Sequence, residues 1–514
     1  MTKPSLVTPF LSLIIAAVVI GQGQDIGGGA GVLVASADVE AKLGKGIFTP
    51  VQNKPHVNKA PEKSAVVRAA HRSNTSNRNA NSNSANNNTG NNNSGNSSNR
   101  NSSKPVIVDA EYYNKQGDDL FDAAKYDQAA TAYQQAVKMR PDYAEAYLNL
   151  GETYFNLGKY DDAIAADNKA ISLKLESADA YRALGLAHLQ KNDLAEAVAA
   201  LKRAYELNSA DPQIRNGLSL AYYDQGVAAY NANNYDEAVA HYRDAINVKS
   251  DYAEAYDNLG DAYRQSNKTA EAIDAYKHAI ALKPDMLETQ SNLSTMYDQM
   301  GKYPEAVEAY RQVIRLKPDD AEANNNMGYA LGKSKRWTEA IAAFQRAIQL
   351  KPDYAEAYSN LGWAYNNTLN YNAALEPLKK SVQLKPALPE GHFNLGITYT
   401  KLLQQQPTQA AAYKQQALAE FQQTIQLKPD WPAAQNNLGV AYGNLGNWKQ
   451  AIVAHNEAVR LKPDYGGAYY NLGVDYLMTG NKKLATQQYE KLKPLNPNNA
   501  NLLYQQIYNK PAPK

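Results

Sequence analysis

The segment KPDYAEAYSNLGWAY, from Lys351 to Tyr365, says most about the fold because close copies of it recur along the chain. RPDYAEAYLNLGETY ends at Tyr154, KSDYAEAYDNLGDAY at Tyr263 and KPDYGGAYYNLGVDY at Tyr476. The glycine of the segment recurs mostly every thirty-four residues, as Gly117, Gly151, Gly185, Gly226, Gly260, Gly328, Gly362, Gly396, Gly439 and Gly473, with Ser219 and Ser294 standing in at two steps. A fixed period of this length predicts stacked units, none of which buries its apolar face alone.

Each unit is expected to consist of two helices. Tyr358, Gly362 and Tyr365 fall on one face at helical spacing, and a turn follows near such glycines as Gly158, Gly301, Gly446 and Gly480. The second helix carries an alanine, an aromatic and an alanine, for example Ala340, Phe344 and Ala347. A proline such as Pro352 then ends it, because proline disfavours helix in the residue before it.

An acidic pair follows most of these prolines. The pairs are Asp142 with Glu145, Asp251 with Glu254, Asp319 with Glu322, and Asp353 with Glu356. Because they recur in step with the helix starts, we interpret them as a variant of the capping box rather than as metal or acid–base sites.

This pattern closely resembles the tetratricopeptide repeat family over about residues 108–499. The resemblance implies an all-α, right-handed superhelical solenoid of about eleven helix hairpins, with a concave groove lined by each unit's first helix. Leu175, Ser209 and Ser250 replace the terminal proline, and Asp167 and His455 replace the second-helix aromatic, so looser packing is expected there. Residues 500–514 are expected to form a capping helix and tail.

Two steps of the repeat are too long. Between Gly185 and Gly226 the excess is seven residues, near 212–218, which predicts one extended helix over about Pro212–Asn231. Between Gly396 and Gly439 it is nine, near 400–416, and Pro407 there predicts that both helices of the unit are lengthened. Each insertion is either a partner site or a tolerated surface extension.

The amino-terminal fifth of the chain differs from the repeats. Residues 1–37 contain the apolar run Leu11–Ile20 and a small-x-small site at Ala35–Ala37, which predict a signal peptide or an amino-terminal anchor. Export to the periplasm or the cell exterior is therefore expected. Residues 38–107 form an Asn/Ser-rich segment expected to be a disordered tether. Residues 38–106 hold ten Lys or Arg and three Asp or Glu, a net of +7 that allows contact with an anionic surface; a solvated linker is the plainer interpretation, and specific nucleic-acid binding is not expected.

The sequence offers no chemistry of its own. The chain has no cysteine, and it contains neither HExxH nor GxSxG, so no cofactor, metal site or enzymatic activity is expected. The segment from Gly328 to Ser334 resembles a phosphate-binding loop. It has one residue too few between its glycines, and it lies within a predicted helix.

A column of asparagines is the most informative polar feature. Each stands two residues before the repeat glycine or serine: Asn149, Asn258, Asn292, Asn326, Asn360, Asn394, Asn437 and Asn471. The array is similar to the superhelical arm of the O-linked N-acetylglucosamine transferases, without a transferase domain. That resemblance implies that the carboxamides face the groove and pair with the backbone of an extended peptide. The alternative is that they bond within or between neighbouring helices.

The neighbours of these asparagines argue against another family function, the carboxylate clamp, which needs basic residues there. Those neighbours include Asp257, Ser359, Phe393 and Tyr470. We therefore predict a non-enzymatic scaffold that binds proteins or extended peptide segments. The alternatives are an envelope-attached assembly protein that self-associates or docks a complex through its insertions, and a glycan-binding protein that uses its tyrosines.

Overall fold

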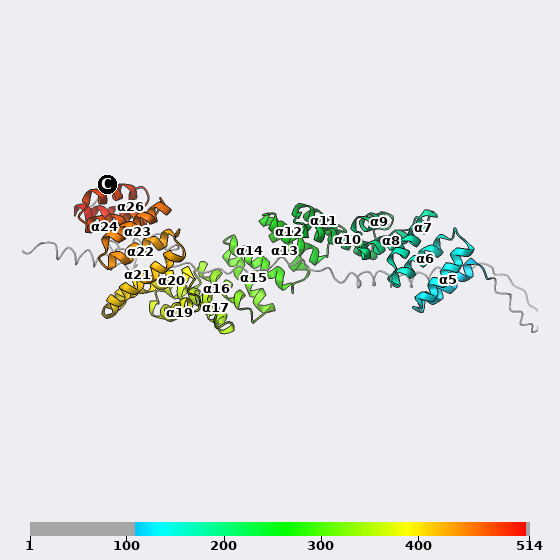
Figure 1. The fold of residues 1–514 in the computed structure, drawn as a ribbon, viewed down its shortest axis with the longest axis horizontal. Coiled ribbons are helices and arrows are strands. Elements are labelled where there is room, and N and C mark those ends of the chain that lie inside the picture. Colours follow the sequence, from blue (N-terminus) through cyan, green and yellow to red (C-terminus); the bar gives the residue numbers. More distant parts are fainter. Residues whose placement is uncertain (1–107, 510–514) are drawn as a thin grey trace, which may run out of the picture. The chain divides into compact units, whose positions relative to one another are not determined.

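A computed structural model describes residues 108–509, which contain helices and no strand (Figure 1). The predicted signal or anchor segment and the predicted tether, residues 1–107, lie outside the described residues. None of the described helices is both long and apolar enough to cross a bilayer.

The described chain divides into two compact units, residues 108–289 and residues 290–509, here called the amino-terminal and carboxy-terminal units. The amino-terminal unit contains α4 (Ala110–Asp122), α5 (Tyr126–Met139), α6 (Ala144–Asn156), α7 (Tyr160–Ser172), α8 (Ala178–Lys191), α9 (Leu194–Leu207), α10 (Pro212–Asn231), α11 (Tyr235–Val248), α12 (Ala253–Gln265) and α13 (Thr269–Leu282). Helix α14 (Leu287–Gln299) begins in this unit and ends in the next.

The carboxy-terminal unit continues the same alternation. It contains α15 (Tyr303–Leu316), α16 (Ala321–Lys333), α17 (Trp337–Leu350), α18 (Ala355–Asn367), α19 (Tyr371–Leu384), α20 (Pro389–Gln405), the 3₁₀ turn η2 (Pro407–Gln409), α21 (Ala410–Leu427), α22 (Pro432–Asn444), α23 (Trp448–Leu461), α24 (Gly466–Met478), α25 (Lys482–Leu492) and α26 (Pro497–Tyr508). The even-numbered helices from α4 to α24 are the first helices of eleven hairpins in residues 108–509, which confirms the all-α fold of tandem hairpins.

The repeat glycine is required because the two helices of a hairpin touch there. A Cβ on Gly260 would lie 2.6 Å from the ring of Tyr276, and one on Gly328 would lie 2.6 Å from the ring of Phe344. These rings and the flanking second-helix alanines are fully buried. In these hairpins the periodic core is therefore one aromatic ring pressed against a helix backbone that has no side chain, whereas Leu201 and Leu378 take the place of the ring against Gly185 and Gly362.

The two polar replacements of the aromatic, His455 and Asp167, both occupy its place. His455 is 1% exposed and lies against Gly439, so the imidazole fills the place of the missing ring, and the expectation of looser packing is wrong there. Asp167 occupies the same place against Gly151 and is also 1% exposed. Burial, followed by the nearby charge of Glu152, raises the pKa of Asp167 well above its ordinary value.

The capping interpretation of the acidic pairs is wrong for most repeats. The N-cap of the first helix is Tyr143, Tyr252 or Tyr354, with no side-chain capping bond, and the aspartate lies one residue earlier. An aspartate caps α16, but it is Asp320, whose carboxylate accepts from the Ala323 amide at 2.9 Å. The sequence pattern located the helix starts correctly but misassigned the acceptor.

A lysine explains the role of the tyrosine and the glutamate at these junctions. Lys249 Nζ lies 5.3 Å from the centre of the Tyr252 ring, and Lys351 Nζ lies 5.0 Å from that of Tyr354. The glutamate forms an ion pair with the lysine that ends its own hairpin, as in Lys283–Glu254 at 3.4 Å. Each such junction is held by a cation over a ring and a surface ion pair.

The predicted insertions take the expected form. Helix α10 spans Pro212–Asn231, and α20 and α21 are both longer than their counterparts, joined by η2 at Pro407–Gln409. Helix α26 packs on α24 and α25 through Ala500, Leu503 and Ile507. The phosphate-loop-like segment lies in α16 and its end, as predicted.

Candidate functional site

The first helices of successive hairpins contact one another within each unit. Contacts join α4 to α6, α6 to α8, α8 to α10 and α10 to α12, and likewise α16 to α18, α18 to α20, α20 to α22 and α22 to α24. No successive pair of second helices makes a contact of similar extent among the described residues. The first helices therefore form the inner side of the local curve, which we call the first-helix face.

The asparagine column lies on these helices and links neighbouring repeats. Asn258 Nδ2 donates to Tyr223 Oη at 2.7 Å, and Asn360 Nδ2 donates to Asn325 Oδ1 at 2.9 Å. The same kind of bond joins Asn394 to Ser359 at 3.3 Å, Asn471 to Asn436 at 2.9 Å, and Asn149 to Asn114 at 3.2 Å. Each acceptor stands thirty-five residues earlier, one position before the column residue of the preceding repeat.

One exception shows why the acceptor matters. In the hairpin before that of Asn437, Phe393 holds the position that supplies the acceptor elsewhere, and its side chain carries no acceptor. The amide of Asn437 instead donates to the carbonyl of Ala433 in its own helix at 2.8 Å. Of the remaining members, Asn326 Oδ1 accepts from Asn325 Nδ2 at 3.2 Å, and Asn292 is buried in α14.

These bonds are the ones that the alternative interpretation requires, in which the column holds neighbouring helices together. They do not test peptide binding, because a carboxamide carries two N–H donors and an oxygen, and a bond to the neighbour occupies only part of that capacity. Peptide contact by the column stays a prediction. The acceptor positions were missed as a second column, although their thirty-five-residue offset is readable in the sequence.

Acidic and tyrosine side chains from α10, α11 and α12 gather in the amino-terminal unit. The ring of Tyr223 stacks on Tyr252 at 5.1 Å and lies 5.7 Å from Tyr242, centre to centre. Asp261 Oδ1 accepts from Tyr276 Oη at 2.6 Å and from Arg264 at 3.0 Å. We call Tyr223, Asp224, Tyr242, Tyr252, Asp257 and Asp261 the acidic–tyrosine cluster.

Burial governs the ionisation of this cluster. It raises the pKa of Tyr223, Tyr242 and Tyr252, and after burial the largest further rise at Tyr252 comes from the charge of Asp224. The pKa of Asp261 is also raised by burial, although its partners Arg264 and Tyr276 oppose the rise. The phenols are therefore hydrogen-bond donors at neutral pH.

A different arrangement occurs at Asp298 in the carboxy-terminal unit. Asp298 is 6% exposed, and burial raises its pKa to about 7, opposed by the charge of Lys333. Nearby, the rings of Tyr329 and Trp363 stack at 6.0 Å, and Trp337 meets Trp363 edge-on at 5.1 Å. This group is largely apolar, in contrast to the acidic–tyrosine cluster.

Two histidines lie between acidic and carbonyl oxygens in the same unit. His392 Nδ1 is 2.6 Å from Glu420 Oε2, and its Nε2 is 2.9 Å from the Pro386 carbonyl. His455 is placed in the same way between Asp475 and the Asn436 carbonyl. Each ring joins two helices, and neither lies in a group of three or more residues able to hold a metal ion in the described chain.

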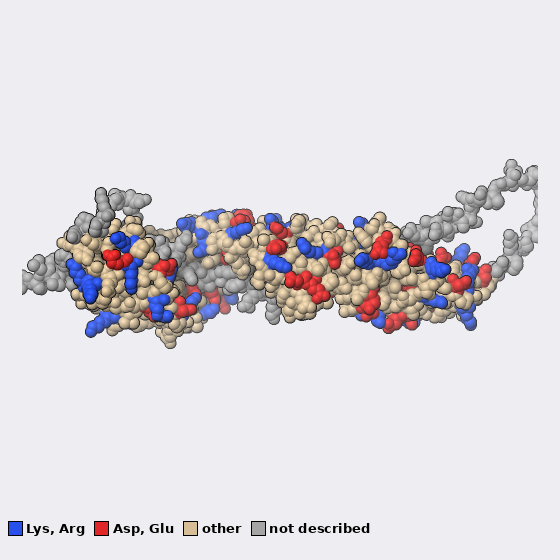
Figure 2. Space-filling model, turned by 90° about the horizontal axis from the view of Figure 1, so that it is seen from above, with Lys and Arg blue, Asp and Glu red and all other residues tan. Residues whose placement is uncertain are grey.

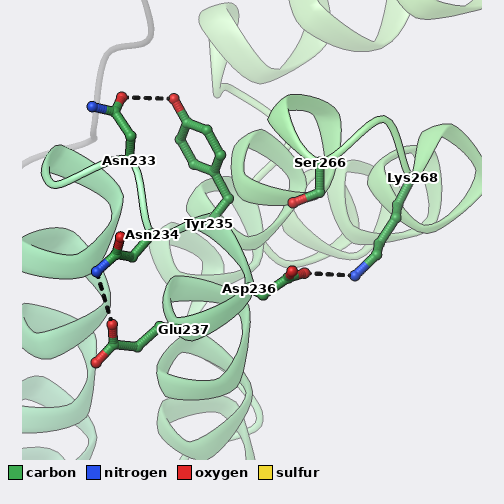
Figure 3. A pocket seen from close by; sticks show the side chains of 7 residues that line it. All are labelled: Asn233, Asn234, Tyr235, Asp236, Glu237, Ser266 and Lys268. Atoms are coloured by element: carbon green, nitrogen blue, oxygen red, sulfur yellow. Dashed lines mark hydrogen bonds and ion pairs between the residues drawn. The ribbon is translucent and has the colours of Figure 1, made fainter.

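An open hollow of about 500 Å³ lies beside the turns of two successive hairpins in the amino-terminal unit (Figure 3). Its polar groups pair with one another: Lys268 with Asp236 at 2.7 Å, Tyr235 with Asn233 at 2.8 Å, and Asn234 with Glu237 at 3.2 Å. Because these partners are mutually satisfied and mostly exposed, the hollow is not our candidate site. Elsewhere on the surface shown in Figure 2, acidic and basic side chains are interspersed.

Comparisons with known proteins agree with this architecture. Models described as tetratricopeptide repeat match residues 114–174, 223–286, 295–355, 325–389 and 432–465, and a model described as TPR repeat matches residues 187–226. Together they cover more than half of the chain. No curated protein matches the chain.

Several solved structures are similar over part or most of the chain. The APC/C hetero-tetramer Cut9–Hcn1 is 16% identical, with a TM-score of 0.38, covering 78% of this chain and 97% of that one. YrrB, titled a TPR protein with an unusual peptide-binding site, is 22% identical, with a TM-score of 0.33 and coverages of 39% and 98%. MamA is 28% identical, with a TM-score of 0.31 and coverages of 34% and 95%. The repeat models and the hairpin architecture together lead to one conclusion: the chain belongs to the tetratricopeptide repeat family.

Proposed function

We propose that this protein is a non-enzymatic scaffold that binds extended segments of partner proteins along the first-helix face. The repeat family supports a role in protein–protein interaction. The finer proposal, a right-handed superhelix whose concave groove grips a peptide backbone, is supported by one observation above all. Carboxamides recur on successive first helices, from Asn258 to Asn471, at the spacing of the repeat.

The spacing suits an extended chain. Neighbouring helices pack about 8–10 Å apart, whereas an extended strand advances about 3.3 Å per residue, so each asparagine would meet roughly every third peptide residue. Each hydrogen bond adds about 0.5–1.5 kcal/mol net. Several in a row give an affinity that depends little on the peptide sequence.

The experiment uses a phage-displayed library of random, unstructured peptides against the full chain. Recovered peptides are then measured by fluorescence anisotropy with the variants Asn360→Ala and Asn394→Ala. Each variant is expected to weaken binding about two- to tenfold, the equivalent of one hydrogen bond. Gln349→Ala, on the exposed side of α17, is the matched control and should change nothing. Equal affinity for all three variants would count against the proposal.

A second candidate function rests on the long hairpin of α20 and α21. Its tip at Gln405, Pro407, Thr408 and Gln409 is exposed, and such a projection could dock a complex or a second copy. Light scattering of the full chain and of a variant lacking residues 404–412 separates the two proposals. Concentration-dependent mass that the deletion abolishes would favour assembly through the tip. We also propose export, with residues 1–37 as a cleaved signal or a retained anchor.

A further inference from the structure

Asp298 carries a buried carboxylate whose Oδ1 has no hydrogen-bond partner. The side chain is 6% exposed and belongs to α14, in the carboxy-terminal unit. Burial raises its pKa, and the charge of Lys333 opposes this rise without forming an ion pair. The ammonium of Lys333 lies instead 5.7 Å from the centre of the Tyr303 ring. A buried carboxylate that no cation contacts is costly to the fold, and such a cost is explained if a ligand supplies the cation.

Polar side chains at the same position of other hairpins are paired within the fold. One repeat before Asp298 stands Arg264, whose guanidinium pairs with Asp261 at 3.0 Å. Two repeats after it stands Asn366, whose amide donates to the Asn394 carbonyl at 3.2 Å. The repeat can therefore satisfy a polar group at this position, and it does not do so at Asp298.

Aromatic rings lie close to this carboxylate. Tyr329 of α16 meets Tyr303 edge-on at 6.5 Å and stacks on Trp363 of α18 at 6.0 Å, centre to centre. Burial and then the charge of Asp298 raise the pKa of Tyr329, so the carboxylate is close enough to act on that phenol. The Tyr329 side chain is partly exposed, whereas Trp363 is buried behind it. A basic side chain can lay its carbon chain on such a ring while its charged end reaches a carboxylate.

These groups lie beside the asparagine column. Tyr329 follows Asn326 by three residues on α16, and Trp363 has the same relation to Asn360 on α18. Residues three apart are neighbours on the surface of a helix. A peptide whose backbone followed the column would therefore pass the Tyr329 ring, with a side chain able to turn toward Asp298.

We infer that Asp298 and Tyr329 form a subsite for a basic residue, lysine or arginine, of a partner peptide that binds along the first-helix face. This inference rests on the proposed function and deepens it, because it names the chemistry of the partner. The ammonium or guanidinium supplies the charge that Asp298 lacks, and the Tyr329 ring covers the carbon chain. The asparagines hold the peptide backbone with little regard to sequence, so this subsite gives the groove its selectivity.

The test is a double-mutant cycle between the full chain and a peptide at pH 8, above the pKa of Asp298. Random peptides are selected on the wild-type chain, and those recovered are measured by fluorescence anisotropy with each lysine or arginine replaced in turn by glutamine. We expect one such replacement to weaken binding to the wild type about tenfold or more, the equivalent of one hydrogen bond between charged groups. The same replacement should weaken binding to Asp298→Asn less than about twofold, because the carboxylate that it met is gone.

Glu305→Gln is the matched control. It removes the same charge on the exposed side of α15, the second helix of the same hairpin, and it should leave the effect of the peptide replacement at its wild-type size. Asp298→Asn keeps the side-chain size and removes a buried charge, so the variant should fold at least as firmly as the wild type at pH 8. Circular dichroism of both variants checks that the helices are retained, so that a loss of affinity is not a loss of structure.

Three results would overturn the inference: recovered peptides without lysine or arginine, a replacement effect of the same size in Asp298→Asn and the wild type, or its equal loss in Asp298→Asn and Glu305→Gln. Failure here is distinguishable from failure of the proposed function, which is tested by Asn360→Ala. Peptides that Asn360→Ala weakens but that show no dependence on Asp298 would refute the inference alone. Recovery of no peptide at all would overturn the proposed function and the inference together.

Discussion

The bond between Asn360 and Asn325 offers the sharpest prediction about what holds the repeats together. Asn360 Nδ2 donates to Asn325 Oδ1 at 2.9 Å, and both side chains are fully buried. Asn360→Ala removes the donor and leaves the Asn325 carboxamide without it, which should cost about 1–3 kcal/mol. Alanine also favours the helix by up to about 0.7 kcal/mol over asparagine, which partly offsets this loss.

The matched control is Asn437→Ala. Its amide donates within its own helix to a carbonyl, and its side chain is partly exposed, so no buried partner on another helix is left behind. The helix-propensity gain is the same, and the net change should lie within about 0.5 kcal/mol of zero. The comparison thus isolates the bond between repeats.

Long repeat arrays seldom unfold in a single step, so a global midpoint is a poor measure. Native-state hydrogen exchange read by mass spectrometry gives the opening free energy of each helix instead. We expect Asn360→Ala to lower it in α16 and α18, and a double-mutant cycle with Asn325→Ala to show coupling of at least about 0.5 kcal/mol. Equal effects of Asn360→Ala and Asn437→Ala, or zero coupling, would show that this bond does not stabilise the contact between the two repeats.

Four further predictions concern separate parts of the chain. Burial would lower the pKa of His392, but hydrogen bonds to Glu420 and the Pro386 carbonyl outweigh it and raise the pKa. The protonated ring should therefore stabilise the fold fully below about pH 6.5, and this stabilisation should be lost as pH rises through the higher pKa of the folded state. A pKa at or below about 6.5 in an NMR titration would contradict this. Burial raises the pKa of Asp298 to about 7, so its carboxylate is charged and destabilising at pH 8 but neutral at pH 4. Asp298→Asn should therefore raise the free energy of unfolding by roughly 1–3 kcal/mol at pH 8 and by little at pH 4, as measured by hydrogen exchange. An equal gain at both pH values would argue against a buried charge. Gly260→Ala places a methyl group 2.6 Å from the Tyr276 ring and should cost about 1–3 kcal/mol, whereas Ala270→Gly on the exposed side of α13 should cost no more than about 1 kcal/mol. If the signal is cleaved after Ala37, amino-terminal sequencing of exported protein begins at Asp38; an intact amino terminus in the soluble fraction would oppose both cleavage and anchoring.

The fold was predictable because each hairpin repeats the same packing problem. Gly260 and Tyr276 recur as a pair in several hairpins, so the period, the helix count and the extended helix at Pro212–Asn231 could be read from the sequence. The capping acceptors could not be read from it. The N-cap of α18 is Tyr354 rather than Asp353, and this difference of one residue depends on where the backbone enters the helical region. Helix ends are decided by local geometry that the period does not encode.

The candidate site was predictable only in its positions. The sequence placed Asn258 and Asn360 on the first helices but could not say which atoms they meet. Their partners, Tyr223 and Asn325, come from the preceding hairpin and appear only when the hairpins are stacked. The acidic–tyrosine cluster was missed for the same reason, because Asp224 and Tyr252 come together from different helices.

Binding along the first-helix face is tested most directly by hydrogen exchange of the full chain with and without a library peptide bound. We expect added protection in the first helices α16, α18 and α20, with little change in their second helices α17 and α19. Protection confined to second helices, or to the tip between α20 and α21, would contradict binding along the first-helix face.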